Sequence, residues 1–185
     1  MNGLQLMVEE HVYIKRMLKV IRQACQLILE DKPVDYGDFA LMIDFVREYA
    51  DKHHHGKEED ILFNRIIEET GETGEKLITH GMMVEHLQGR LFIHDLEQAV
   101  EAVQKGNHDA RLDVIANAIS YTHLLNRHID KEDDVVYPFA DRKLKSETLE
   151  QIHGECAIFE GKQMTDRIQE KYVRLVSELE AKYGL

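Results

Sequence analysis

The sequence predicts an all-α protein in which four long helices form an up-down-up-down bundle, with one or two extra helices at the C-terminal end. Apolar residues recur at spacings of three and four over long stretches, which is the period of a buried helix face. Only two prolines occur in 185 residues, and no stretch alternates in the manner of a half-buried strand. The breaks between the long stretches are short, which favours antiparallel neighbours.

Each helix is predicted from its apolar seam and from the residues that end it. Pro33 lacks the amide hydrogen that continuation of the first helix would need. Gly71 and Gly74 bracket the second break, and Gly106 follows the third helix as a glycine stop. The expected helices cover residues 3–30, about 36–69, a third stretch ending at about 105, about 109–142, near 147–160 and near 163–183.

Length and composition predict a single domain, residues 1–185, with a bundle core at about 3–142 and a C-terminal helical extension at about 146–183. The net charge of −12, without a compact Lys/Arg cluster, argues against nucleic acid as a partner. We find no signal-peptide pattern and no apolar run long enough for a membrane span, so we expect a cytoplasmic protein without a membrane partner. Cys25 and Cys156 are too few for a disulfide framework or a thiolate metal site.

One motif with chemical potential occurs twice: a histidine followed four residues later by a glutamate. His54 precedes Glu58, and His128 precedes Glu132. In both places further acidic residues and an apolar-aromatic end follow. The four-residue spacing places both side chains of each pair on one face of a helix, one turn apart.

The predicted bundle brings two further histidines to the same level. His11 occupies a seam position of the first helix where an apolar residue would be expected, and His86 lies on the apolar side of the third. His11 and His54 lie about 18–20 residues from the loop between them, and His86 and His128 lie about 20 from theirs, so each pair shares a level at about 1.5 Å per residue. The sequence therefore predicts four histidines and two glutamates in one layer of the core.

Six ionisable groups in a bundle core would each be costly to bury if they were unpaired. A pair of metal ions removes this cost, because neutral imidazoles donate nitrogen and ionised carboxylates neutralise and bridge the cations. Nitrogen and oxygen ligands without thiolate suit iron, manganese or zinc, and six ligands are too many for one tetrahedral zinc. The alternative interpretation is a charged helix surface that carries His and Glu by chance.

These motifs resemble those of the hemerythrin-like, or HHE cation-binding, family over about residues 3–142. The matching pieces are Val8-Glu9-Glu10-His11, His54 to Phe63, Val84-Glu85-His86 and His128 to Phe139, and the segment from Glu170 to Gly184 is similar to the tail of prokaryotic members. The resemblance implies a four-helix bundle around two iron ions in a non-haem centre of the Fe–O–Fe type, with manganese or zinc as alternatives. Carried over by position, the terminal ligands are His11, His54, His86 and His128, and the bridging carboxylates are Glu58 and Glu132.

The chain departs from the oxygen-carrying members at one position. Arg90 stands four residues after His86, where those members have a second histidine. Among the remaining histidines we name His123 as the candidate for a fifth nitrogen ligand, although it precedes His128 by five residues and so points about 140° away around a helix. The others are expected on the surface or in packing roles.

Three functions are compatible with such a centre. The first is binding or sensing of O2 or a related small ligand such as NO, because fewer histidines leave more coordination positions open. The second is an enzyme that reduces peroxide or NO with an unknown redox partner, and the sequence leaves open whether turnover occurs. The third is iron storage or donation, for which no ferroxidase cage or nucleation surface is recognisable.

The C-terminal helix carries an apolar stripe with two interpretations. Its residues are Ile168, Tyr172, Leu175, Leu179 and Tyr183. The stripe either covers the side of the bundle itself or forms the face of a homodimer.

Overall fold

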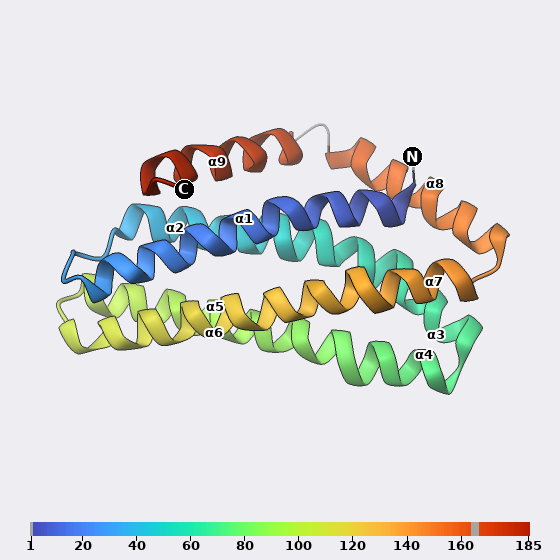
Figure 1. The fold of residues 1–185 in the computed structure, drawn as a ribbon, viewed down its shortest axis with the longest axis horizontal. Coiled ribbons are helices and arrows are strands. Elements are labelled where there is room, and N and C mark those ends of the chain that lie inside the picture. Colours follow the sequence, from blue (N-terminus) through green and yellow to red (C-terminus); the bar gives the residue numbers. More distant parts are fainter. Residues whose placement is uncertain (1, 164–166) are drawn as a thin grey trace.

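Four long helical rods run antiparallel in the computed structural model, which describes residues 2–163 and 167–185 (Figure 1). The first rod is α1 (Gly3–Leu29), and the second joins α2 (Tyr36–Phe45), the π-helical segments η1 (Val46–His55) and η2 (Glu58–Phe63), and α3 (Asn64–Thr70). The third joins α4 (Glu72–Leu77), the π-helical η3 (Ile78–Met82) and α5 (Met83–Gln104). The fourth joins the short turn η4 (His108–Ala110), α6 (Arg111–Lys131), the π-helical η5 (Glu132–Val136) and α7 (Tyr137–Lys143). The predicted all-α bundle is confirmed.

Local sequence explains where the rods begin and end. The side chains of Asn2 and Asp35 each accept a hydrogen bond from the amide three residues later, at 3.2 and 3.0 Å, and so cap the first two rods. Gly71 and Gly106 follow the second and third rods with φ angles of 59° and 98°. A side chain would strain the backbone there, so glycine ends both rods.

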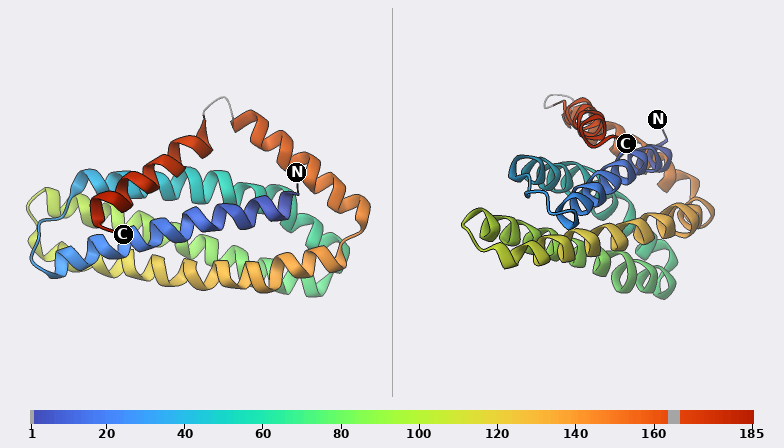
Figure 2. Two further views of the ribbon diagram at one scale, coloured as in Figure 1. Left: turned by 45° about the horizontal axis from the view of Figure 1, so that its top comes forward. Right: turned by 60° about the vertical axis from the view of Figure 1, so that its left-hand side comes forward.

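Two further helices, α8 (Ser146–Gln163) and α9 (Ile168–Tyr183), cover one side of the bundle. Figure 2 shows them lying over the first and second rods, and both pack against α1. Tyr172 and Leu179 of the predicted stripe are buried in the bundle's apolar core, and the other three stripe residues are partly buried against it. The stripe therefore covers the bundle itself. Residues 164–166 of the predicted last helix lie outside the described residues.

The apolar core is divided in two by a layer of buried polar side chains. The larger cluster includes Ile14, Met42 and Val114, and the smaller one includes Met7 and Leu62. Between them lie the histidines and glutamates of the repeated motif, each no more than 1% exposed. Apolar packing on both sides thus removes this layer from water and makes any unpaired charge in it costly.

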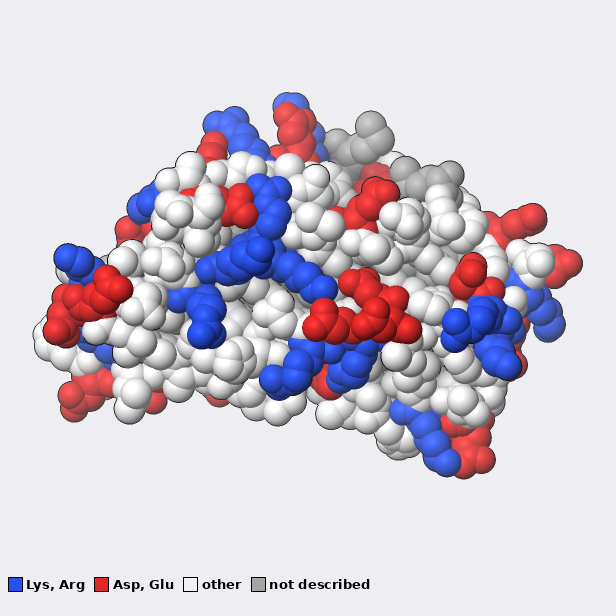
Figure 3. Space-filling model, in the orientation of Figure 1, with Lys and Arg blue, Asp and Glu red and all other residues white. Residues whose placement is uncertain are grey.

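The surface is charged but mixed in sign. On the face in Figure 3, the described Lys and Arg side chains lie beside Asp and Glu rather than forming a uniform basic surface. Among the described helices, none is long and apolar enough to cross a membrane.

Candidate metal centre

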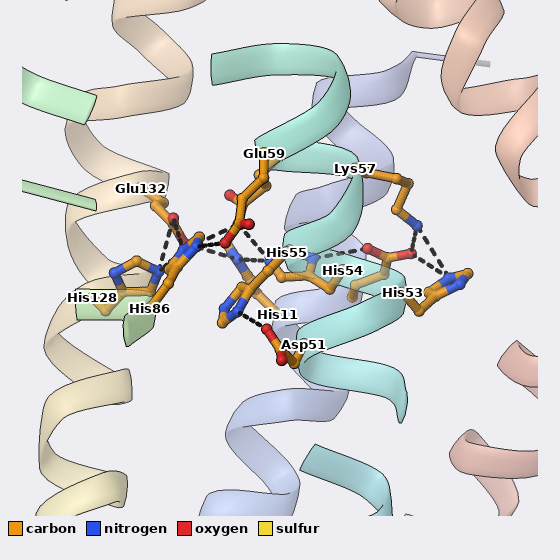
Figure 4. Close-up of polar contacts among 12 residues, drawn as sticks. His11, Asp51, His53, His54, His55, Lys57, Glu59, His86, His128 and Glu132 are labelled. Carbon is orange, nitrogen blue, oxygen red and sulfur yellow. Dashed lines mark hydrogen bonds and ion pairs between the residues drawn. The ribbon is translucent and has the colours of Figure 1, made fainter. Parts of the chain in front are cut away.

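Four histidines meet in the polar layer, one from each rod (Figure 4). The Nε2 atoms of His11 and His54 face each other 2.9 Å apart, and those of His86 and His128 lie 3.0 Å apart. All four rings are buried. The structure therefore gathers the predicted histidines as two pairs, one from the first two rods and one from the last two.

Two glutamates connect the histidine pairs. Glu132 places Oε2 3.3 Å from His11 Nε2 and Oε1 2.9 Å from His128 Nε2. Glu58 places its Oε2 3.7 Å from His54 Nε2 and 3.6 Å from His86 Nε2. Each carboxylate thus reaches one histidine of each pair, as a bridging ligand must.

Three oxygens of these two carboxylates lack ordinary hydrogen-bond partners. Glu58 Oε2 and both oxygens of Glu132 are buried and accept no hydrogen bond from the described residues. A buried acceptor without a hydrogen bond is costly. Here the carboxylate oxygens face the Nε2 atoms of the four histidines, whose hydrogen-bond-distance contacts lie within the layer. Shared cations would satisfy all of these atoms at once, so the residues fit a metal site.

The chain matches the family described as Hemerythrin HHE cation binding domain over residues 2–140. It belongs to this family. The match contains all four rods up to α7 and every residue of the polar layer, whereas α8 and α9 lie beyond it. No curated protein and no solved structure matches the chain.

The histidines of this HHE domain are held by a closed ring of carboxylates. Each Nδ1 donates to a carboxylate of a neighbouring rod: His11 to Asp133 at 2.7 Å, His54 to Glu10 at 2.8 Å, His86 to Glu59 at 2.6 Å and His128 to Glu85 at 2.9 Å. The second rod donates to the first, the third to the second, the fourth to the third and the first to the fourth. This hydrogen bonding assigns the proton to Nδ1 and leaves the Nε2 lone pair directed at the centre, which is the orientation a metal ligand needs.

Burial and charge shift the protonation of the layer in opposite directions. Burial and the neighbouring His11 lower the pKa of His54 to about 4. Burial alone would also lower the pKa of His128, but Glu132 and Glu85 raise it to about 9. Burial and the nearby Glu132 raise the pKa of Glu58 well above its usual range. Without a metal the layer therefore retains protons that a bound cation would displace.

The structure brings in a fifth histidine that the sequence analysis left among the surface and packing residues. His55 is 6% exposed, and its ring stacks on His86 with centroids 3.8 Å apart. One ligand atom each of His55, Glu58, His86 and His128 lies within 4.8 Å of the others, and the same holds for His11, His54, Glu58 and Glu132. The π-helical segment η1 explains this, because its wider turn lets neighbouring residues 54 and 55 both face the layer.

His123 is not part of the layer, contrary to the sequence-based expectation. It is exposed on α6, with its Nε2 3.3 Å from Arg22 Nη1. The reason is helical geometry, since α6 is a regular helix up to Lys131 and residues five apart do not share a face.

Tyr137 was also missed as a site residue. Its hydroxyl donates to Glu58 Oε1 at 2.6 Å, and its ring stacks on His11 at 5.6 Å. The only sequence signal is its place in the aromatic end of the second motif, five residues after Glu132. Tyr137 thus satisfies the oxygen of Glu58 that does not face the histidines.

Proposed function

We propose that this HHE domain binds two iron ions and that the reduced centre binds O2 or a related small ligand such as NO or peroxide. The observation that supports this proposal is the pair of ligand groups described above, which share Glu58. Two ions bound there would supply electrons and an open coordination position to the small ligand.

The proposal gives each residue of the layer one task. His11 and His54 would hold one ion, and His86 and His128 would hold the other with His55 as a further nitrogen ligand. Glu58 and Glu132 would serve both ions. The ring of Nδ1 hydrogen bonds keeps the imidazoles oriented, and Tyr137 orients Glu58. The two apolar clusters exclude bulk water from the layer, which strengthens every electrostatic interaction inside it.

Iron is favoured by the proposed chemistry rather than by the ligands alone. Imidazole and carboxylate ligands also accept manganese and zinc, and the order of affinities favours zinc over ferrous iron. Protein for the titration is therefore loaded with ferrous iron in the absence of oxygen and of competing metals.

The test is a titration of the anaerobic, iron-loaded protein with NO and then with O2, followed by optical and electron paramagnetic resonance spectra. We expect a saturable spectral change that reverses when the ligand is removed. His86→Ala should abolish the change, because it removes a ligand of the proposed second ion. His123→Ala, which alters an exposed histidine, is the matched control and should titrate like the wild type.

The same titration separates the alternatives. Continuous consumption of NO or peroxide with a reductant, lost in Glu58→Ala, would establish an enzyme instead of a reversible binder. No spectral change in a protein that holds two irons would contradict the proposal. Uptake of many more than two irons per chain would point to storage.

A further inference from the structure

A cavity reaches the metal layer from the side opposite α8 and α9. It lies between η1, α5 and α6 and has a volume of about 90 Å³. One water needs about 10–15 Å³, so there is room for a small ligand. His55 and His86 line its buried end, so a molecule in the cavity lies beside the second ligand group.

The walls of the cavity are mostly apolar. Val46, Ile93 and Leu125 line it and are all buried. Tyr121 also lines it, is 2% exposed and carries a neutral hydroxyl that can donate a hydrogen bond. Apolar side chains supply most of the accessible surface of the cavity, and such a surface favours a small uncharged molecule over an ion, which would lose its hydration there.

The charged residues at the cavity are already paired. Arg90 places Nη2 2.6 Å from Asp51 and 2.7 Å from Glu59. Arg47 makes two hydrogen bonds to Glu97, at 2.8 and 2.6 Å. Because carboxylates neutralise both guanidinium groups, these arginines offer little attraction to an incoming anion.

Gly89 is the residue that leaves the cavity its space. It lies inside α5 with ordinary helical backbone, where alanine would stabilise the helix by about 1 kcal/mol. No backbone requirement explains a glycine there. A Cβ at this position would stand 3.5 Å from the Tyr121 ring and 3.9 Å from Leu124, which is ordinary contact. Because Gly89 and Tyr121 both line the cavity, a larger side chain at position 89 would take up part of its volume.

We propose that this cavity is the entry and docking pocket for a small uncharged ligand of two or three atoms on its way to the metal layer, and that Gly89 is the residue that keeps it open. The proposal rests on the proposed function, since it names the route and the ligand class of the same centre. Tyr121 faces the docked ligand as a hydrogen-bond donor, and the paired arginines leave anions without a counter-charge.

The test is stopped-flow association of NO with the anaerobic, ferrous-loaded full chain. Gly89→Leu should slow association at least tenfold, and Gly89→Ala should slow it less, in the order of the volume added. Metal content should stay at the wild-type value in both variants. Gly154→Leu is the matched control, because Gly154 is an exposed helical glycine of α8 with nothing within 4 Å of a Cβ, and it should associate like the wild type.

The outcomes separate the two proposals. Wild-type association in Gly89→Leu, with metal content intact, would overturn the cavity proposal alone. No NO signal from the wild type itself would overturn the proposed function and this proposal with it. If Gly89→Leu does not load metal, Val46→Phe fills the same cavity from η1 and must show the same slowing.

Azide tests the ligand class. This small anion should associate at least tenfold more slowly than NO in the wild type. Arg90→Ala should widen the difference, because it leaves Asp51 and Glu59 without their counter-ion. Equal rates for azide and NO in the wild type would contradict the preference for uncharged ligands.

Discussion

Three consecutive histidines reach three different environments, and they divide the metal layer into two sides (Figure 4). His54 points into the layer. His53 points to what we term the covered side, where Glu10, Lys57, Glu160 and Gln169 meet beneath α8 and α9. His55 lies at the edge of the layer on what we term the open side, which comprises Asp51, Arg90 and the cavity. The covered side packs against the layer, and the open side contains the cavity proposed for ligand entry.

The covered side is buried and densely paired. Lys57 is fully buried, and its ammonium group contacts both Glu10 and Glu160. Gln169 of α9 donates to Glu10 at 2.9 Å, and Glu10 in turn fixes His54. On the open side, Arg90 is 36% exposed and its partner Asp51 is 25% exposed. The C-terminal helices are therefore part of the support of one ligand, whereas the opposite side is left accessible to solvent.

The largest effect is expected where the two sides meet. Glu58→Ala removes the shared ligand, so we expect the loss of both metal ions per chain, measured by elemental analysis of the purified protein. Asp60→Ala, which changes an exposed acid two residues away, should retain both. Loss of only one ion in Glu58→Ala would mean that the two ligand groups act independently.

The second prediction compares the two cations. Lys57→Met should destabilise the metal-free protein by about 3–5 kcal/mol, because it leaves the buried Glu10 carboxylate and the half-buried Glu160 carboxylate without their counter-ion. Arg90→Ala should cost only about 0–1 kcal/mol, since its ion pairs are partly exposed. Urea denaturation measures both changes in the free energy of unfolding. Similar costs for the two variants would remove the distinction between the sides.

The third prediction concerns the carboxylates that orient the histidines. Glu10→Gln and Glu85→Gln should each weaken metal affinity by about 10- to 100-fold. Glu10→Gln should have the larger effect, because Glu10 is 1% exposed, whereas Glu85 is 22% exposed and water can replace part of its hydrogen bonding. Competition with a chromophoric chelator gives both affinities. A larger loss of affinity in Glu85→Gln would contradict the tighter support that we assign to the covered side.

The fourth prediction is the dependence of metal affinity on pH. In the metal-free protein His128 has a pKa raised to about 9, so below that pH a cation must displace its proton. The apparent affinity should therefore rise with pH, by up to about tenfold per unit for each proton displaced, and level off near pH 9. His54, with a pKa lowered to about 4, adds nothing to the slope in this range. Zinc titrations from pH 7 to 10 would measure the rise in affinity. An affinity independent of pH would contradict the conclusion that the metal-free layer holds a proton on His128.

The sequence predicted the bundle and the six-residue layer because both depend on regular helical spacing. The motif pairs His54–Glu58 and His128–Glu132 need only a turn of helix to share a face, and the loop positions set the common level of the rods. The structure brings these side chains together as the spacing predicts.

What could not be predicted depends on departures from regular helix and on partners from other rods. The inward turn of His55 comes from the π-helical η1, which no simple periodicity indicates. The burial of Lys57 depends on α8 and α9, whose placement over the first two rods is a tertiary property. The carboxylates that hold the histidines left a signal in retrospect: Glu10 and Glu85 directly precede a histidine of the layer, but each pairs with the histidine of another rod.

The most direct test of a two-metal layer is the metal content per chain of protein purified anaerobically from iron-replete cells, with His54→Ala prepared in parallel. The account predicts two irons per chain in the wild type and the loss of both in the variant, because the ions share their bridging glutamates. One zinc per chain, or no metal, would contradict the account.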